Sequence, residues 1–281
     1  MNAQAIDIRQ AAHPRDVRRY DTSQLRADFL IENLFEAGKL RLTYSHLDRM
    51  IVGGAMPAGS PVVLAPCKPT GTPDFLARRE MGIINIGGPG MVSASGHAYP
   101  LARLDALYLP PGSTEVSFAG TDPGNPAKFY LLSTSGTRVT AAKLIRQAEA
   151  KKIELGSPET SNQRMIHQYI VPALCNTNQL VMGLTRLATG SVWNTMPAHT
   201  HDRRSEAYLY FDLAADARVI HLMGEPGETR HLVVANEQAI LSPNWSIHSG
   251  CGTSSYSFIW GMGGDNVEFT DMDPVAMAEL R

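Results

Sequence analysis

Three histidines and one glutamate are spaced as metal ligands. His199 and His201 are separated by one residue, Glu206 follows after a short polar run, and His248 lies further along the chain. Neutral imidazole nitrogens and a carboxylate oxygen are ligands that Zn²⁺ and similar divalent ions accept. Because this set neutralises only part of the charge of such an ion, we predict a metal site that keeps positive charge for chemistry.

The residues around the ligands predict how they meet. Side chains at i and i+2 of a strand share a face, so His199 and His201 can point together. The polar run 202–205 predicts a turn, and the apolar run 206–211 predicts the next strand. The resulting hairpin would return the glutamate to the histidines, whereas His248 comes from a distant segment and must be delivered by the fold.

The composition indicates a soluble globular protein. A length of 281 residues suffices for one large or two ordinary domains, and 24 Gly with 18 Pro indicate many turns and strands. A net charge of -2 leaves no basic surface for nucleic acid. The start of the chain lacks a signal-peptide pattern, and no apolar run is long enough to cross a bilayer. We therefore expect a cytoplasmic protein with no nucleic-acid or membrane partner.

The cysteines predict reduced thiols. Cys67, Cys175 and Cys251 are odd in number and show no C-x-x-C pairing. Although Cys251 lies only three residues after His248, we interpret it as a small buried apolar residue.

Helical patterns are confined to two segments. Residues 21–37 have polar starters, a repeated apolar face and Gly38 as a stop, and residues 141–152 follow Thr140 as a possible cap. Elsewhere short apolar segments alternate with Gly, Pro, Asn and Asp, as in sandwiches and barrels. The pattern predicts an all-β fold with a few short helices.

The two halves of the chain echo each other. Residues 78–86 resemble 203–211, and residues 105–112 resemble 238–243. The first copy has neither the H-x-H motif nor a counterpart of the last histidine, so only the second copy can hold the metal. The repeat predicts two tandem barrel-like domains that are joined near residues 140–160. The first, 1–150, is degenerate and begins with a helix, and the second, 151–281, binds the metal.

These motifs resemble known families. The H-x-H-x4-E run with a distant histidine in a β-rich domain resembles the cupin superfamily, whose jelly-roll barrels hold a metal at the open end. Across essentially the whole chain, the sequence is similar to the 5-keto-4-deoxyuronate isomerase family. Four segments carry this resemblance: Gly53–Pro57, Gln179–Thr185, Pro197–Leu213 and Met272–Arg281.

The resemblance implies an activity and a cofactor. It implies interconversion of 5-keto-4-deoxyuronate, a small-molecule uronate, with 3-deoxy-D-glycero-2,5-hexodiulosonate, a step in the breakdown of pectin-derived uronates. It also implies one zinc ion per chain, held by the family's ligands at His199, His201, Glu206 and His248. The family further implies a homo-oligomer, a hexamer.

The remaining catalytic roles stay open at the level of sequence. In such an aldose-ketose shift the metal would stabilise an enediolate while a base moves the proton, and Glu206, Asp202 or a metal-bound hydroxide are candidates for the base. Arg203 or Arg204 could hold the substrate carboxylate, although both could equally be exposed turn residues. The tryptophans suit a pocket wall or core packing. The competing function is a metal-dependent dioxygenase acting on a small organic acid, because the same ligand set holds redox-active metals.

Overall fold

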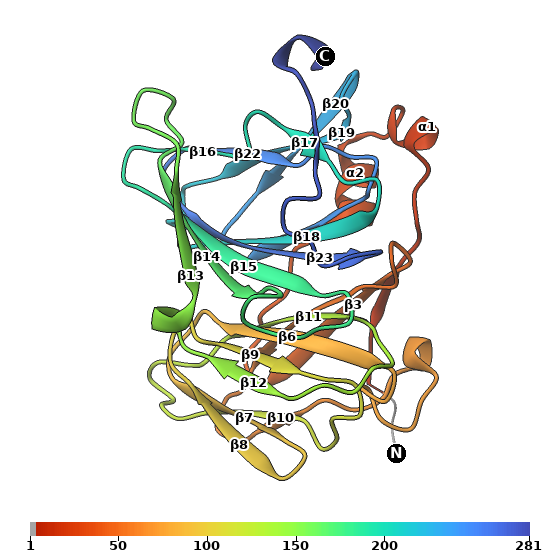
Figure 1. Cartoon of the computed structure of the whole chain (residues 1–281), viewed down its shortest axis with the longest axis vertical. Helices are drawn as coiled ribbons and strands as arrows, with labels where there is room; N and C mark the ends of the chain where they lie inside the picture. The colour runs from red at the N-terminus through yellow and green to blue at the C-terminus, as the bar shows by residue number, and fades with distance from the viewer. Residues whose placement is uncertain (1–3) are drawn as a thin grey trace. The chain divides into compact units, whose positions relative to one another are not determined.

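The computed structural model describes residues 4–281, which divide into two units (Figure 1). The first contains the residues up to Arg9, Asn33–Ala150 and Tyr169–Val181. The second contains Gln10–Glu32, Lys151–Gln168 and Met182–Arg281. Part of the N-terminal region therefore belongs to the second unit. The organisation into domains 1–150 and 151–281 stays a prediction.

The first unit consists of two sheets. The larger sheet contains, in spatial order, β1 (Asp7–Arg9), β3 (Lys39–Ser45), β4 (Ile51–Met56), β11 (Phe129–Ser135), β6 (Arg79–Asn85), β9 (Ala106–Leu109) and β12 (Lys143–Ile145). The smaller sheet contains β5 (Val62–Val63), β10 (Ser117–Gly120), β7 (Gly90–Ala94) and β8 (His97–Leu101). A shared apolar core, which includes Phe118 and Phe129, joins strands of both sheets. The 3-10 turns are η1 (Lys68–Thr70) and η2 (Gln147–Glu149).

The second unit repeats this plan. Its larger sheet contains β13 (Lys151–Leu155), β14 (Arg164–Ile170), β15 (Val181–Leu187), β23 (Ser257–Gly264), β18 (Arg204–Phe211), β21 (Gln238–Ser242) and β2 (Leu30–Ile31). Its smaller sheet contains β16 (Trp193–Asn194), β22 (Ser249–Gly252), β19 (Val219–Glu225) and β20 (Glu228–Val234). A further strand pair consists of β17 (His199–Thr200) and β24 (Asp273–Pro274), and η3 (Met277–Glu279) follows. The all-β prediction is confirmed.

The predicted repeat is visible in the strand order. Five strands of the first large sheet, β3-β4-β11-β6-β9, correspond in order to β14-β15-β23-β18-β21 of the second. Arg79 on β6 therefore corresponds to Arg204 on β18, and Met81 corresponds to Glu206. Met81 is fully buried within the apolar core of the first unit. An apolar side chain thus stands where the second unit carries a carboxylate, which explains physically why the first copy has no equivalent ligand set.

The helix predictions were only partly right. The helix expected over 21–37 is α2 (Thr22–Phe29), which begins at a capping box between Asp21 and Gln24. It ends early because Leu30 and Ile31 pair with β21 as an edge strand. A shorter helix, α1 (Pro14–Val17), precedes it.

The helix expected over 141–152 was wrong. This segment forms β12, η2 and the start of β13. Lys143–Ile145 pairs with β9, and the Asp105 carboxylate accepts hydrogen bonds from the Arg146 side chain and the Gln147 backbone. These long-range contacts satisfy the backbone and outweigh the local helix propensity.

The cysteines and the helices can also be compared with the predictions. The three cysteines are free, as predicted; Cys67 and Cys175 are buried, whereas Cys251, predicted to be buried, is partly exposed on β22. No helix within residues 4–281 is long and apolar enough to span a membrane.

Candidate metal centre

The strand that carries the first two histidines has an unexpected partner. β17 pairs with β24 near the C-terminus, with His199 opposite Pro274 and Thr200 opposite Asp273. The predicted hairpin between the histidine strand and the glutamate strand is therefore wrong. A turn nevertheless leads from His201 directly into β18, so Glu206 still returns to the histidines.

His248 reaches the site at the end of a turn between β21 and β22. The turn is closed by the hydrogen bond from the Ser246 backbone N–H to the Pro243 carbonyl, at 3.0 Å. The Ser246 hydroxyl also accepts a hydrogen bond from the Gly224 backbone N–H, at 2.9 Å. These contacts fasten the turn to β19 and place His248 at the first position before β22.

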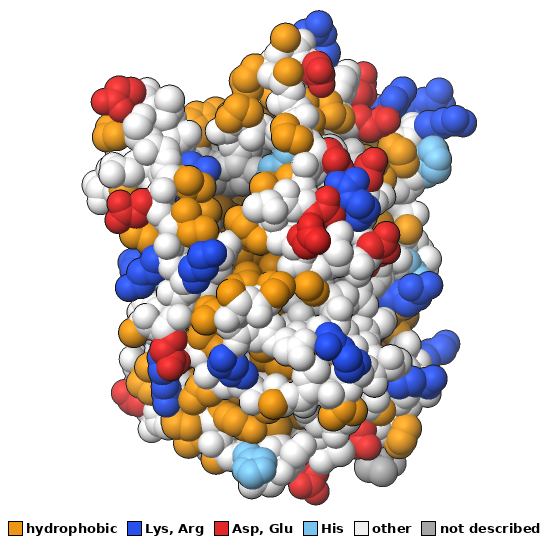
Figure 2. Space-filling model, in the orientation of Figure 1, with side chains coloured by type: hydrophobic (Ala, Val, Ile, Leu, Met, Phe, Trp, Pro, Cys, Tyr) orange, Lys and Arg blue, Asp and Glu red, His pale blue; other side chains and the backbone are white. Residues whose placement is uncertain are grey.

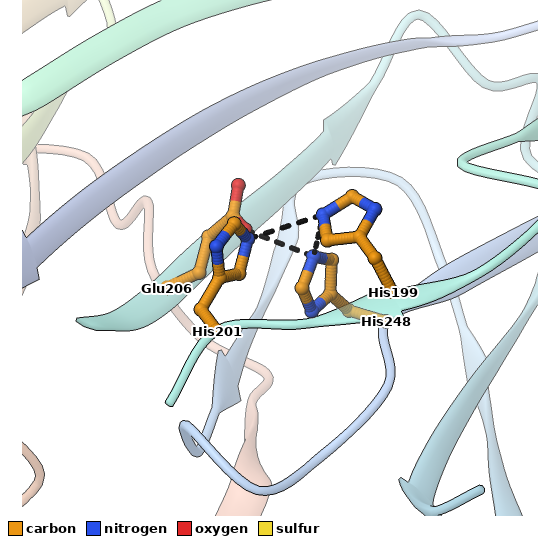
Figure 3. Close-up of side chains that lie close together, drawn as sticks. All are labelled: His199, His201, Glu206 and His248. Atoms are coloured by element: carbon orange, nitrogen blue, oxygen red, sulfur yellow. Dashed lines mark hydrogen bonds and ion pairs between the residues drawn. The ribbon is translucent and has the colours of Figure 1, made fainter. Parts of the chain in front are cut away.

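Four ligand atoms converge in the second unit (Figure 3). The Nε2 atom of His199 lies 3.1 Å from Nε2 of His201 and 2.9 Å from Nε2 of His248. The Oε2 atom of Glu206 lies 3.1 Å from Nε2 of His201 and 3.0 Å from Nε2 of His248. Two ligand atoms that each lie about 2.0–2.2 Å from the same ion, with an angle of roughly 90° at the ion, would be about 3 Å apart. The observed distances match this value. The donor set and its geometry therefore fit a divalent metal ion.

The protonation states also suit metal binding. Burial, followed by the charges of His248 and His201, lowers the pKa of His199 to about 2. Burial alone would raise the pKa of Glu206, but the favourable interactions with His248 and His201 outweigh it and hold that pKa below its usual range. His199 is thus neutral and Glu206 ionised at neutral pH, and these are the forms that bind a metal.

The cluster borders a cavity of about 260 Å³. Figure 2 shows a hollow in one face of the second unit, with a histidine side chain inside it and hydrophobic side chains around its rim. Three of the four candidate ligands line the cavity, and most other lining side chains are apolar or aromatic. At about 30 Å³ per water molecule, the volume equals that of roughly nine waters, which suits a small molecule.

The other predicted site residues lie outside this cavity. Asp202 is exposed in the turn, and its backbone carbonyl accepts from the Asn244 side chain. Arg204 is buried, and its guanidinium donates to backbone carbonyls of the C-terminal segment. Arg203 forms ion pairs with Asp271 and does not line the cavity either. Sequence neighbours of the ligands thus point away from the space that the ligands face.

The cavity contains polar residues that were not singled out from the sequence. Among its described lining residues, Arg164 on β14 is the one Lys or Arg side chain. Tyr208 also lines it and shares side-chain hydrogen bonds with Thr195 and Glu206. Strand alternation offered a signal for Tyr208, because it follows Glu206 at i+2 and therefore shares its face. For Arg164 the signal was weaker: a charged residue that opens a mostly apolar strand.

One tryptophan contributes to the wall. Trp260 lines the cavity, and its indole N–H donates to the Thr185 hydroxyl at 3.1 Å. Gly183, on the same strand as Thr185, makes room for that ring, since a Cβ there would lie 2.2 Å from it. Trp245 instead packs against Phe29, with ring centroids 6.4 Å apart.

The sequence was compared with known protein families and relatives. The KduI/IolB family matches residues 29–277. The chain belongs to this family. It is 56% identical over 276 residues to the 4-deoxy-L-threo-5-hexosulose-uronate ketol-isomerase of Cereibacter sphaeroides, covering 98% of this chain and 99% of that one. It is 55% identical over 283 residues to 4-deoxy-L-threo-5-hexosulose-uronate ketol-isomerase 2 of Rhizobium meliloti, covering both chains fully.

Solved structures of low sequence identity share the fold. A crystal structure of an IolB-like protein from Salmonella typhimurium matches with a TM-score of 0.72 at 16% identity, covering 89% of this chain and 97% of the other. An oxalate decarboxylase from Bacillus subtilis matches with a TM-score of 0.54 at 10% identity, covering 78% and 70%. These matches confirm the cupin-like jelly-roll architecture predicted from the sequence.

Proposed function

We propose that this protein is a ketol-isomerase that interconverts 5-keto-4-deoxyuronate and 3-deoxy-D-glycero-2,5-hexodiulosonate in the breakdown of pectin-derived uronates. The observation that carries the proposal is the buried cluster of three histidines and one glutamate beside a small cavity. It occurs in a chain 56% identical, over 98% of its length, to a relative named for this reaction. The enzyme class is thus an aldose-ketose isomerase, with a small sugar acid as substrate.

We assign the metal to the four converging side chains and propose zinc. Three imidazoles and one carboxylate are common zinc ligands, and the second unit brings one ligand atom of each within 4.8 Å of the others. When bound, a divalent ion supplies Lewis acidity toward the carbonyl oxygen of the substrate. His199, His201, Glu206 and His248 hold that ion, one per chain.

We assign the substrate carboxylate to Arg164. Neither Arg203 nor Arg204 faces the cavity, because both are engaged by the C-terminal segment. Arg164 lines the cavity, and its Nη1–H donates a hydrogen bond to the Asn162 carbonyl at 2.8 Å, which holds the side chain in place. The rest of its guanidinium can form a paired hydrogen bond with a carboxylate.

We assign the proton transfer to Glu206, supported by Tyr208. The contacts of Glu206 with the histidines all involve Oε2, so Oε1 is the oxygen that accepts the proton from the hydroxyl-bearing carbon and returns it to the former aldehyde carbon, while the hydroxyl proton passes to the former aldehyde oxygen. Burial, and then the charge of Glu206, raises the pKa of Tyr208 well above its ordinary value. The tyrosine therefore stays protonated, and its hydroxyl donates to the Glu206 carboxylate and orients it. Asp202, which is exposed, has no role in this scheme.

The surroundings of the site favour this chemistry. Apolar and aromatic side chains form most of the wall, so water is largely displaced when the substrate enters and the hydrogen bonds to it are strengthened. Following the family resemblance, we also propose that the protein acts in the cytoplasm as a hexamer.

An anaerobic assay tests the reaction. The unsaturated uronate released by a pectate-degrading lyase is offered to the purified protein without oxygen, and ¹³C NMR follows the loss of the aldehyde hydrate and the appearance of a hydroxymethyl ketone. In D₂O, deuterium should appear on the hydroxymethyl carbon. Absence of this product, or turnover that requires oxygen, contradicts the isomerase and favours the dioxygenase.

The carboxylate assignment has its own test. Arg164→Met should raise KM about 10- to 100-fold and change kcat less, because a charged hydrogen bond of about 1.5–3 kcal/mol is lost from both the bound substrate and the transition state. Arg186→Met, an exposed arginine on the neighbouring strand β15, is the control and should behave like the unaltered protein. Equal KM values for the two variants would rule out Arg164 as the anchor.

A further inference from the structure

Two adjacent arginines fasten one segment of the C-terminal region. We call this segment, residues 268–273, the strap. Arg204 donates to the backbone carbonyls of Glu268 and Asp271, each at 2.6 Å. Arg203 donates to both carboxylate oxygens of Asp271 at 2.8 and 2.9 Å and to those of Asp273 at 2.9 and 3.0 Å. Between them they bind the strap at its start, middle and end.

The strap contacts the candidate metal centre directly. The Asp271 carbonyl, one of those bound by Arg204, also accepts a hydrogen bond from His201 Nδ1–H at 3.0 Å. A carbonyl can only accept, so this bond places the proton on Nδ1 and leaves the Nε2 lone pair for a metal. Phe269 and Met272, also in the strap, line the cavity. One short segment therefore orients a ligand and forms part of the wall.

The two arginines differ from a ligand-binding arginine in their surroundings. Arg204 is 1% exposed, and its two shortest hydrogen bonds are to main-chain oxygens, which fixes a backbone segment in place; its Nη2 also lies 3.4 Å from His201 Nδ1. The corresponding Arg79 of the first unit is also buried, but it donates to the carbonyls of Arg49 and Ser133. The position is thus a backbone clamp in both units, but only in the second does the clamped carbonyl hold a candidate metal ligand.

We propose that Arg203 and Arg204 are positioning residues: they hold the strap so that the Asp271 carbonyl keeps His201 in the metal-binding tautomer and Phe269 and Met272 cover the cavity. The proposal rests on the proposed metal centre. It gives a role to both arginines next to the ligand motif without requiring either to touch the substrate.

The test measures metal binding without substrate. Metal-free protein is titrated with Co²⁺ alone, followed by its visible absorption, and ¹⁵N NMR of the histidine rings reports the tautomer of His201. Arg203→Met, which keeps the apolar stem of a partly exposed side chain, should weaken Co²⁺ affinity about 10-fold or more. It should also reduce the fraction of His201 protonated at Nδ1. Arg203→Lys should restore part of the affinity.

Two controls separate positioning from general damage. Arg18→Met removes another exposed ion pair of the second unit, with Glu225, far in sequence from the ligands. Its Co²⁺ affinity should equal that of the unaltered protein. Arg204→Lys should weaken Co²⁺ binding, whereas Arg79→Lys, the same change at the corresponding position of the first unit, should not.

The outcomes are distinguishable. If Arg203→Met has the same Co²⁺ affinity and the same His201 tautomer as Arg18→Met, the positioning role is overturned. A loss of affinity that Arg79→Lys shows to the same extent as Arg204→Lys also overturns it, since the effect would then be one of folding alone. If the unaltered protein binds no Co²⁺, the metal centre itself is refuted, and the isomerase assay then decides the function separately.

Discussion

A buried carboxylate in the first unit leads to a quantitative prediction. Glu80 on β6 is fully buried, and its Oε1 accepts hydrogen bonds from the Thr134 hydroxyl at 3.0 Å and from the backbone N–H groups of residues 179 and 180, each at 2.8 Å. Its Oε2 accepts from the Tyr108 hydroxyl at 2.8 Å and from the backbone N–H of residue 178 at 2.7 Å. Three consecutive backbone donors thus depend on one side chain.

The magnitude of Glu80→Gln follows from these contacts. The amide nitrogen must replace Oε2, because at Oε1 it would leave two backbone donors without an acceptor. The Tyr108 hydroxyl can turn to accept from it and donate to the Thr140 hydroxyl, 3.1 Å away. The partly buried N–H of residue 178 is then left unpaired, which costs about 1–3 kcal/mol. With the charge removed from the remaining bonds, we expect a loss of about 2–4 kcal/mol in the free energy of unfolding.

Urea unfolding at neutral pH measures this loss. The midpoint for Glu80→Gln should fall while the slope with denaturant stays unchanged, since the same surface is exposed on unfolding. Glu115→Gln, at an exposed position of the same unit, should stay within about 0.5 kcal/mol of the unaltered protein. A loss below about 1 kcal/mol for Glu80→Gln would refute the reasoning, because it would mean that the three backbone donors find other partners.

Three further predictions concern the second unit. Chelation should abolish turnover while the strand signal in circular dichroism persists, and His248→Ala should lower zinc content and turnover together; full activity of metal-free protein would contradict both. Burial, and then the charge of His248, lowers the pKa of His221 to about 3. The unfolded chain takes up this proton from about pH 6.5 downward and the folded chain does not, so stability is intact above pH 6.5 and falls toward pH 3, by up to about 1.4 kcal/mol per unit. His221→Gln should flatten this slope in urea titrations, and an unchanged slope would show that other groups control it.

The parts of the structure that depend on short-range pattern could be predicted from the sequence. Alternation and turn residues indicated the strands, and the H-x-H motif with the following glutamate gave three candidate metal ligands within eight residues. The similarity between the two halves of the sequence indicated the repeat, because corresponding central strands retain similar core residues. Met81 and Glu206 are an exception, since an apolar residue in the first half corresponds to a carboxylate in the second.

What failed depended on partners far away in the chain. Residues 141–152 have helical propensity, yet pairing with β9 makes part of them a strand. The histidine strand pairs with β24, whose residues lie more than 70 positions later, so no local pattern could reveal that contact. Local propensity and turn residues determine the free energy of a segment's own conformation. The stabilisation that the segment gains in a strand depends on the neighbouring strand with which it pairs.

The same limit applies to the proposed anchor of the substrate carboxylate. Arg203 and Arg204 adjoin the candidate ligands in sequence, but β18 directs Glu206 into the cavity, whereas Arg203 in the preceding turn and Arg204 at the start of β18 bind the C-terminal segment. Arg164 is 35 residues before His199 and reaches the same cavity because β14 and β18 belong to one sheet. Residues close in sequence lie on the same segment, whereas residues of one binding site lie on the same face of a sheet. Candidate ligands in one short segment can therefore be found from the sequence, but residues on other strands can be found only when the order of strands in the sheet is known.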